Sequence, residues 1–266
     1  KVTSHVLLCD MPEELGYSQQ YYTKRTTHLV RIETDQGIVG WGECFGPGNV
    51  AIANKSIVEN VIAPMIIGED ALVRDVIWHK VYNLLRDHGQ KGMPLQALSG
   101  VDIALWDIKA KFFETPIWNL LGGKLRDKIR LHLLLGIIYG NSKSKNEGLY
   151  ESAKKAVKDG FTALKIDPLP DNYYDLSLDK LIKETVQTVA ALREGAGSEV
   201  DIILEIHRKL TPMTSVHLAE AMKEFNPMFF EDPIQIDSII SQSDIAKRVS
   251  IPIANGERMH SIWEFR

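Results

Sequence analysis

From residue 129 to residue 257 the sequence alternates between short apolar segments and longer amphipathic ones, and this alternation restricts the fold more than any other feature. It predicts strands over 129–136, 162–167, 201–207, 228–232 and 251–257, with helices over 148–158, 177–194, 213–224 and 237–247. Such alternation indicates a parallel sheet, because parallel neighbours need a crossover connection. Both a doubly wound sheet and a (β/α)8 barrel would satisfy the pattern.

Polar residues at the ends of the predicted strands favour the barrel. Four strands each end in a polar pair: Lys165 with Asp167, Glu205 with His207, Glu231 with Asp232, and Glu257 with Arg258. Barrel enzymes carry their chemistry on several strand ends, whereas a doubly wound sheet concentrates it at one switch point and usually has a glycine fingerprint. The nearest glycine-rich run, residues 40–46, misses that spacing and lies in a predicted hairpin. We interpret its glycines as turn glycines.

The first 125 residues have a different pattern, which predicts a small α+β domain. The segment THLVRIETDQGIVGWGECF predicts two antiparallel strands around a turn at residues 35–37. Helices are expected over 51–65 and 75–86, and Ser99 is expected to open a third helix with capping-box chemistry. Gly122-Gly123 should end the helical stretch that follows. We therefore expect one domain over residues 1–125 and a second over 126–266.

The composition excludes several classes of protein. The 266 residues carry a net charge of −4 and no Lys/Arg-rich run, so neither nucleic acid nor an anionic membrane is an expected partner, and a small molecule is favoured. Two cysteines, Cys9 and Cys44, indicate neither a disulfide framework nor a zinc site. The N-terminal apolar run is too short for a signal sequence, and no segment is long enough to span a membrane. We expect a cytoplasmic protein.

Three acids recur at equal spacing on consecutive predicted strand ends: Glu205, Glu231 and Glu257. In a barrel they would be neighbours, and three converging carboxylates repel one another unless some are protonated or a cation lies between them. Oxygen ligands favour magnesium over zinc or copper. The alternative for each acid is a helix cap or an ion pair with a neighbour, a role that Asp232 or Arg258 could also fill.

Several motifs together resemble the enolase superfamily in its mandelate racemase-like branch. They are the helix SGVDIALWDIKAK, the segment PIWNLLGG after it, and the strand ends LEIH, FFEDP and IPIANGERM. The resemblance implies an α+β capping domain followed by a (β/α)8-type barrel, of which about five βα units are present. It also implies one Mg²⁺ ion bound by Glu205, Glu231 and Glu257. The first ligand is more often Asp in this family, so Glu205 is a departure.

Within the branch the chain is similar to sugar-acid dehydratases of the galactonate and gluconate type. The resemblance implies a lyase that dehydrates an aldonate such as galactonate, gluconate, arabinonate or xylonate to a 2-keto-3-deoxy acid through an enediolate. His207, expected on the same strand face as Glu205, is similar to the family histidine that protonates the leaving hydroxide. Its alternative role is to orient a ligand or to hydrogen-bond in the barrel mouth.

Lys165 and Asp167 bear on the choice of reaction. Racemases and cycloisomerases of this branch resemble one another in carrying Lys-x-Lys where this chain has Lys165-Ile166-Asp167, which weakens the racemase alternative. Lys165 is expected to face the substrate carboxylate or to pair with Asp167, either catalytically or as a plain ion pair. Asp167 is expected to accept a hydrogen bond from a substrate hydroxyl or to hold Lys165. A non-catalytic metal-binding descendant of the scaffold is a further alternative.

Two segments of the first domain correspond to loops that close over the site in this family. They are residues 16–25, which include Tyr21, and residues 45–49, which include Asn49; both side chains are candidates for substrate binding, and ordinary surface loops are the alternative. The family also implies a homo-oligomer. An eight-stranded barrel needs about three more βα units, so we expect the C2 base beyond Arg266. We also expect residues 1–266 alone to leave a sheet edge and apolar faces exposed to water.

Overall fold

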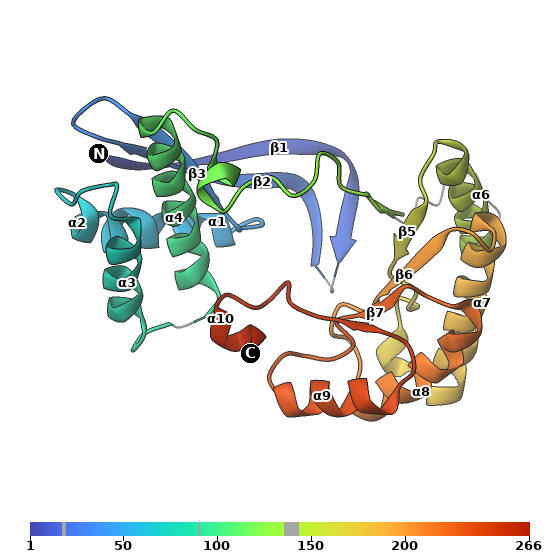
Figure 1. Cartoon of the computed structure of the whole chain (residues 1–266). Coiled ribbons are helices and arrows are strands. Elements are labelled where there is room, and N and C mark those ends of the chain that lie inside the picture. Colours follow the sequence, from blue (N-terminus) through green and yellow to red (C-terminus); the bar gives the residue numbers. More distant parts are fainter. Residues whose placement is uncertain (18–19, 90, 136–143) are drawn as a thin grey trace. The chain divides into compact units, whose positions relative to one another are not determined.

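A computed structural model describes residues 1–17, 20–89, 91–135 and 144–266 of the chain (Figure 1). The chain divides into two compact units. The first comprises Lys1–Gly16, Gln20–Asp127 and Arg258–Arg266, and the second is built mainly of Lys128–Glu257. Within the described ranges, no helix is long and apolar enough to cross a membrane.

The first unit consists of an antiparallel sheet and a set of helices. Its elements are β1 (Val2–Tyr17), β2 (Gln20–Glu33), β3 (Val39–Cys44), α1 (Val50–Ser56), the π-helical segment η1 (Ile57–Ile62), α2 (Ala63–Ile66), α3 (Arg74–Leu85), α4 (Met93–Phe112), α5 (Ile117–Leu120) and α10 (Ile262–Phe265). The strand order is β1-β2-β3. The predicted hairpin is confirmed, with Glu33 opposite Val39 and Gly37 in the left-handed region at φ +79°. The long strand β1 was not predicted. Residues 16 and 17 end β1 and residues 20–25 begin β2, although we had expected a loop there.

Helix α4 packs closely against β3, and glycines on both elements permit this contact. A Cβ atom added to Gly40 or Gly42 would lie 2.1 Å from the Ala104 carbonyl oxygen or 1.9 Å from that of Gly100. A Cβ on Gly100 would meet the Cys44 sulfur at 2.2 Å. The interpretation of Gly40 and Gly42 as turn glycines was therefore wrong. They lie in a strand whose backbone a helix approaches directly.

The prediction that Ser99 opens α4 was also wrong. The helix begins at Met93, six residues earlier, with Pro94 in its first turn, where the missing N–H of proline is tolerated. The Ser99 hydroxyl donates to the Leu95 carbonyl oxygen at 2.7 Å, as a serine inside a helix does. The predicted end is confirmed, since Gly122 and Gly123 have positive φ just after α5.

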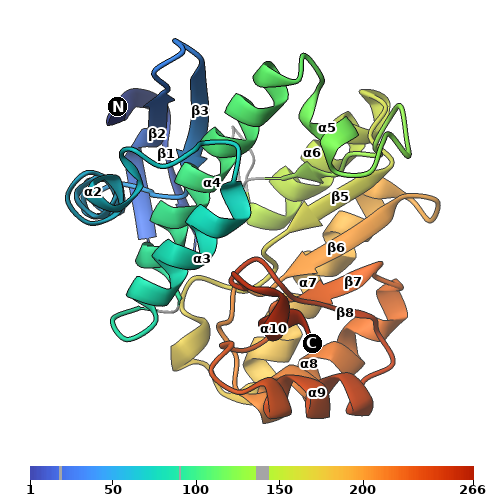
Figure 2. The ribbon, with the colours of Figure 1, turned by 60° about the vertical axis from the view of Figure 1, so that its left-hand side comes forward.

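The second unit is a parallel sheet with helices on one face (Figure 2). Its elements are β4 (Leu133–Leu134), α6 (Lys145–Lys158), β5 (Ala163–Ile166), η2 (Tyr173–Asp175), α7 (Leu178–Ala196), β6 (Asp201–Glu205), α8 (Pro212–Met222), η3 (Lys223–Phe225), β7 (Phe229–Glu231), α9 (Ile239–Arg248) and β8 (Ile253–Ala254). The strands follow one another in sequence order, β4-β5-β6-β7-β8. This order has no switch point, which confirms the predicted barrel-type unit of five strands.

Three strands of this sheet differ from their predicted bounds by two or more residues. The first and last strands of the sheet, β4 and β8, are two residues long, whereas eight and seven residues were expected. Strand β6 ends at Glu205 instead of residue 207, because His207 and Arg208 have left-handed φ values of +52° and +64°. The strand interior is apolar and fully buried, with Ile202, Ile203 and Leu204 each at most 1% exposed.

Candidate metal centre

The strand register brings three glutamates together at one end of the parallel sheet. Glu205 lies directly opposite Glu231 in the pairing of β6 with β7, and Glu231 lies opposite Ala254 in the pairing of β7 with β8. Glu257 follows three residues after Ala254. One carboxylate oxygen from each of Glu205, Glu231 and Glu257 lies within 4.8 Å of the other two. The structure thus groups the three acids that the sequence spacing singled out.

The carboxylates differ in burial, and their mutual repulsion is visible in one pKa. The Glu205 side chain is 1% exposed, that of Glu231 17% and that of Glu257 46%. Burial raises the pKa of Glu231, and the adjacent Glu205 carboxylate adds a smaller increase; together these two effects outweigh the lowering by Lys165. Buried carboxylates in close contact require compensating positive charge, and three oxygen donors at this spacing fit a hard divalent cation such as Mg²⁺.

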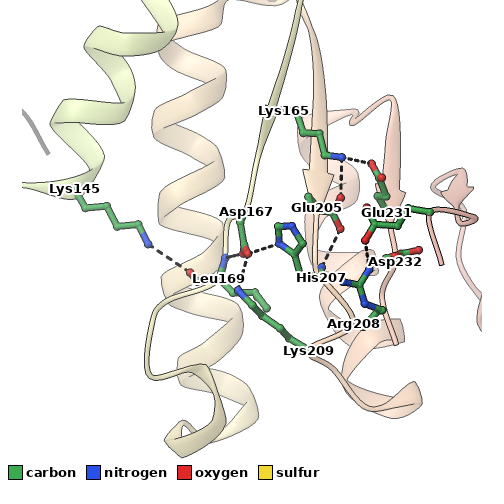
Figure 3. A network of polar contacts seen from close by, with 11 residues as sticks. Lys145, Lys165, Asp167, Leu169, Glu205, His207, Arg208, Lys209, Glu231 and Asp232 are labelled. Carbon is green, nitrogen blue, oxygen red and sulfur yellow. Dashed lines mark hydrogen bonds and ion pairs between the residues drawn. The ribbon is translucent and has the colours of Figure 1, made fainter. Parts of the chain in front are cut away.

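Lys165 lies beside the two most buried carboxylates (Figure 3). Its Nζ atom is 2.8 Å from Oε2 of Glu205 and 2.7 Å from Oε2 of Glu231. Burial acts to lower the pKa of Lys165, but these two hydrogen bonds raise it overall. The ammonium therefore stays charged. Of the two pairings considered from the sequence, the one with Asp167 was wrong, because within the described structure Lys165 pairs with glutamates.

Arg208 compensates the charge on the other side of the glutamates. Its guanidinium group bridges Asp232 and Glu257, and its peptide N–H donates to the Asp232 carbonyl oxygen at 2.7 Å. Burial raises the pKa of Asp232 despite the opposing effect of Arg208. Asp232 also has a positive φ of +44°. Left-handed backbone at non-glycine residues costs about 1–3 kcal/mol each, so this cluster stores strain that the surrounding contacts must offset.

His207 lies beside the glutamates, but for a different reason from the one expected. Because its φ is positive, it does not continue β6, and the expectation based on strand alternation was wrong. Its peptide N–H instead donates to Oε1 of Glu205 at 2.9 Å. Its ring Nδ1 lies 2.8 Å from Oδ2 of Asp167, at the end of β5. The same Asp167 oxygen accepts from Nζ of Lys209 at 2.6 Å.

The two candidates on the first unit stay predictions. Tyr21 lies in β2, and its side chain is outside the described part of the structure. Asn49 lies at the N-terminus of α1 and is exposed, and its carbonyl oxygen, not its side chain, accepts bonds from the first turn.

Sequence reasoning did not single out two basic residues of the cluster, Arg208 and Lys209. The run His207-Arg208-Lys209 is a possible signal, because basic residues directly after a strand that ends in Glu205 can compensate a group of acids. The acid with which Arg208 or Lys209 pairs could not be predicted, because it depends on the left-handed backbone at His207 and Arg208.

Comparison with known proteins assigns the chain to a family. Residues 8–122 match the mandelate racemase / muconate lactonizing enzyme N-terminal domain, and residues 148–266 match the enolase C-terminal domain-like family. The chain belongs to the enolase superfamily, in its mandelate racemase-like branch.

Its relatives include enzymes named for different reactions. The chain is 31% identical to D-galactarolactone cycloisomerase of Agrobacterium fabrum over 99% of its length and 66% of that protein. It is 31% identical to arabinonate dehydratase of Saccharolobus solfataricus over 88% of its length and 59% of that protein. The chain therefore spans less than two thirds of the length of these two relatives.

A solved structure extends the similarity to the fold. The crystal structure of a racemase from Streptomyces coelicolor A3(2) with bound magnesium is 25% identical to the chain and superposes with a TM-score of 0.87. The match covers 100% of this chain and 71% of that one. The similarity supports an enzyme of this superfamily and leaves the reaction open among those that its relatives are named for.

Proposed function

We propose that the protein is a Mg²⁺-dependent dehydratase that converts a sugar acid to its 2-keto-3-deoxy acid. The observation that carries this proposal is the meeting of Glu205, Glu231 and Glu257 within 4.8 Å, with His207 bonded to the first of them. Three oxygen ligands provide for a hard cation, and the histidine provides a proton donor next to it.

Stabilisation of negative charge is the first requirement of the reaction. Transfer of the C2 proton of a sugar acid to a general base places a second negative charge on the carboxylate oxygens of the acid, and a bound Mg²⁺ ion would supply compensating positive charge there. Lys165 adds a second cationic group at the same end of the sheet. We assign Lys165 to orient either the substrate carboxylate or the metal-binding carboxylates of Glu205 and Glu231. Either contact would favour the negative charge that develops on the substrate.

His207 serves the second requirement, the departure of the C3 hydroxyl group. The electrons of the former C2–H bond form the C2–C3 double bond as the C3–O bond breaks, and its electron pair stays on oxygen. A proton from the His207 ring converts the departing hydroxide to water. The enol that remains tautomerises to the 2-keto acid.

A cycloisomerase of the same superfamily is the second candidate, favoured by the 31% identity over 99% of the chain to D-galactarolactone cycloisomerase. The two reactions differ in mass balance, because dehydration removes one water from the substrate and cycloisomerisation removes none. The acids, Lys165 and His207 would serve either reaction.

A substrate screen tests both candidates. The full-length protein with Mg²⁺ would be incubated with a panel of aldonates and sugar lactones. The masses of the products would be measured by mass spectrometry, and 2-keto acid formation would be assayed. We expect an aldonate product lighter by one water, and no product from the matched Glu231→Gln variant. Products of unchanged mass from a lactone alone would replace the dehydratase by the cycloisomerase.

The first unit has a proposed role as well. We propose that it forms a capping domain and that Tyr21 and Asn49 contact the sugar acid. Tyr21→Phe and Asn49→Ala should raise KM more than they lower kcat, because substrate binding and not proton transfer depends on them. A homo-oligomer is part of the same proposal, and its mass in solution tests it.

A further inference from the structure

Asp167 is the centre of a small hydrogen-bonded cluster to which the proposed reaction assigns no role (Figure 3). Its Oδ2 atom faces both Nδ1 of His207, at 2.8 Å, and Nζ of Lys209, at 2.6 Å. Its Oδ1 atom accepts from the peptide N–H of Leu169 at 3.3 Å. The three side chains are 14–21% exposed. The cluster therefore fixes the carboxylate from its own loop and from the loop that follows β6.

We propose that Asp167 is a positioning residue for His207, and that Lys209 holds Asp167 in place for this task. The inference rests on the proposed function, in which His207 supplies the proton for the leaving group. It differs from the roles expected from the sequence, in which Asp167 would bind a substrate hydroxyl or hold Lys165.

The chemistry of the two groups determines which ring nitrogen carries hydrogen toward Asp167. An ionised carboxylate only accepts hydrogen bonds, so Nδ1 must be the donor in this contact. Burial acts to raise the pKa of Asp167, but the hydrogen bond from His207 and the charge of Lys209 hold it below its usual value. With Nδ1–H committed to Asp167, the proton that His207 transfers is the one on Nε2.

Lys209 is suited to hold the carboxylate without taking part in proton transfer. Its ammonium lies 5.5 Å from the centre of the Tyr173 ring, over which a cation is attracted. The side chain is therefore fixed at both the ring and the carboxylate. A lysine held in this way places its ammonium group beside Asp167 and disfavours rotation of the carboxylate away from His207.

The backbone explains why His207 needs an external support. A residue in a regular strand is oriented by the ladder on both sides, but His207 follows the end of β6 and has a φ of +52°. Its peptide N–H is bonded to Glu205, and its ring to Asp167 on the neighbouring strand end. Two contacts from different elements thus define the position of an otherwise strained residue.

Ring tautomer and turnover, measured together, test the proposal. The full-length protein would carry ¹⁵N-histidine, and the His207 ring signals, assigned by their loss in His207→Asn, would report which nitrogen bears hydrogen. Asp167→Ala should shift His207 from a single Nδ1–H state to a mixture of tautomers. We expect kcat to fall about 10- to 100-fold, with KM and Mg²⁺ affinity changed no more than about threefold, because only the orientation of the acid is lost.

Two further variants separate positioning from a general loss of structure. Asp167→Asn keeps an acceptor oxygen of the same shape, so it should retain the Nδ1–H state in part and lose less kcat than Asp167→Ala. Asp201→Asn is the matched control, because Asp201 has an ion pair with Arg130 at the start of β6, in the same unit. It should leave both the tautomer and kcat as in the wild type.

The outcomes distinguish this inference from the proposed function. An unchanged His207 tautomer in Asp167→Ala overturns the inference, as does a loss of Mg²⁺ affinity equal to the loss of kcat. A His207→Asn variant that dehydrates at a near wild-type rate would reject His207 as the acid. In that case the tautomer measurement would still decide whether Asp167 holds the ring.

Discussion

At the scale of single residues, metal binding and leaving-group protonation are assigned to different side chains and can be separated. Glu231→Gln removes one negative charge from the carboxylate cluster, so we expect Mg²⁺ binding to become undetectable and turnover to stop. His207→Asn keeps all three carboxylates and should bind Mg²⁺ within about threefold of the wild type, with dehydration lowered about 100-fold or more.

Calorimetric titration with Mg²⁺ and a 2-keto acid assay check both variants. Retention of C2 proton exchange with solvent in His207→Asn would add to the separation, because exchange does not require the leaving group to depart. Loss of Mg²⁺ binding in His207→Asn would contradict the assignment of separate roles.

His28 in the first unit supports a prediction about pH. Its side chain is fully buried, and neither ring nitrogen has a hydrogen-bond partner in the described structure. Burial lowers the pKa of His28 below 6.5, and Lys55 adds to this while Glu59 opposes it. Below about pH 6.5 the unfolded chain therefore binds a proton that the folded chain does not, and folding stability falls as the pH falls.

Replacement of His28 by leucine should remove this part of the pH dependence. Urea unfolding at pH 7.5 and at pH 5.5 would be compared for the wild type, His28→Leu and the control His79→Leu, whose histidine is exposed on α3. We expect a smaller loss of stability at acid pH in His28→Leu alone. Equal losses in all three proteins would show that His28 does not control the acid sensitivity.

At the scale of elements, patterns that depend on sequence neighbours could be predicted and contacts between elements could not. The hairpin around Gly37 and the helices of the second unit follow from local alternation and turn residues. The start of α4 could not be read from Ser99, because that hydroxyl bonds inside the helix. The role of Gly42 also depends on a helix that is distant in sequence.

Contact between β3 and α4 yields a stability prediction. A methyl group at Gly42 would have to occupy space 1.9 Å from the Gly100 carbonyl oxygen, and backbone cannot shift as easily as a side chain. We expect Gly42→Ala to destabilise the protein by about 1–3 kcal/mol or more, the usual cost of overpacking. Glu43→Ala, at the exposed neighbouring position of the same strand, should change stability by no more than about 0.5 kcal/mol. Chemical denaturation measures both.

At the scale of the whole molecule, equal spacing of Glu205, Glu231 and Glu257 was enough to predict their convergence, because consecutive parallel strands end at one edge of the sheet. The partners of these acids could not be predicted in the same way. Lys165 forms ion pairs with the glutamates. Arg208 pairs with Glu257, whereas the next residue, Lys209, pairs with Asp167. These choices follow from left-handed backbone after β6, which no local sequence pattern indicates.

The outer strands of the parallel sheet lead to a prediction about solution behaviour. In the described part of the sheet, β4 is an outer strand, and Ile129, Leu131 and Leu134 beside or within it are 79%, 69% and 58% exposed. Unpaired strand edges with apolar side chains favour association between copies. We therefore expect residues 1–266, expressed by themselves, to self-associate as concentration rises, and the double variant Ile129→Lys/Leu131→Lys to reduce this association.

The control Ile240→Lys replaces an equally exposed side chain on α9, away from a strand edge, and should have a smaller effect. Sedimentation velocity measures all three proteins, and a monomeric wild type or an equal effect of Ile240→Lys would reject β4 as the surface responsible.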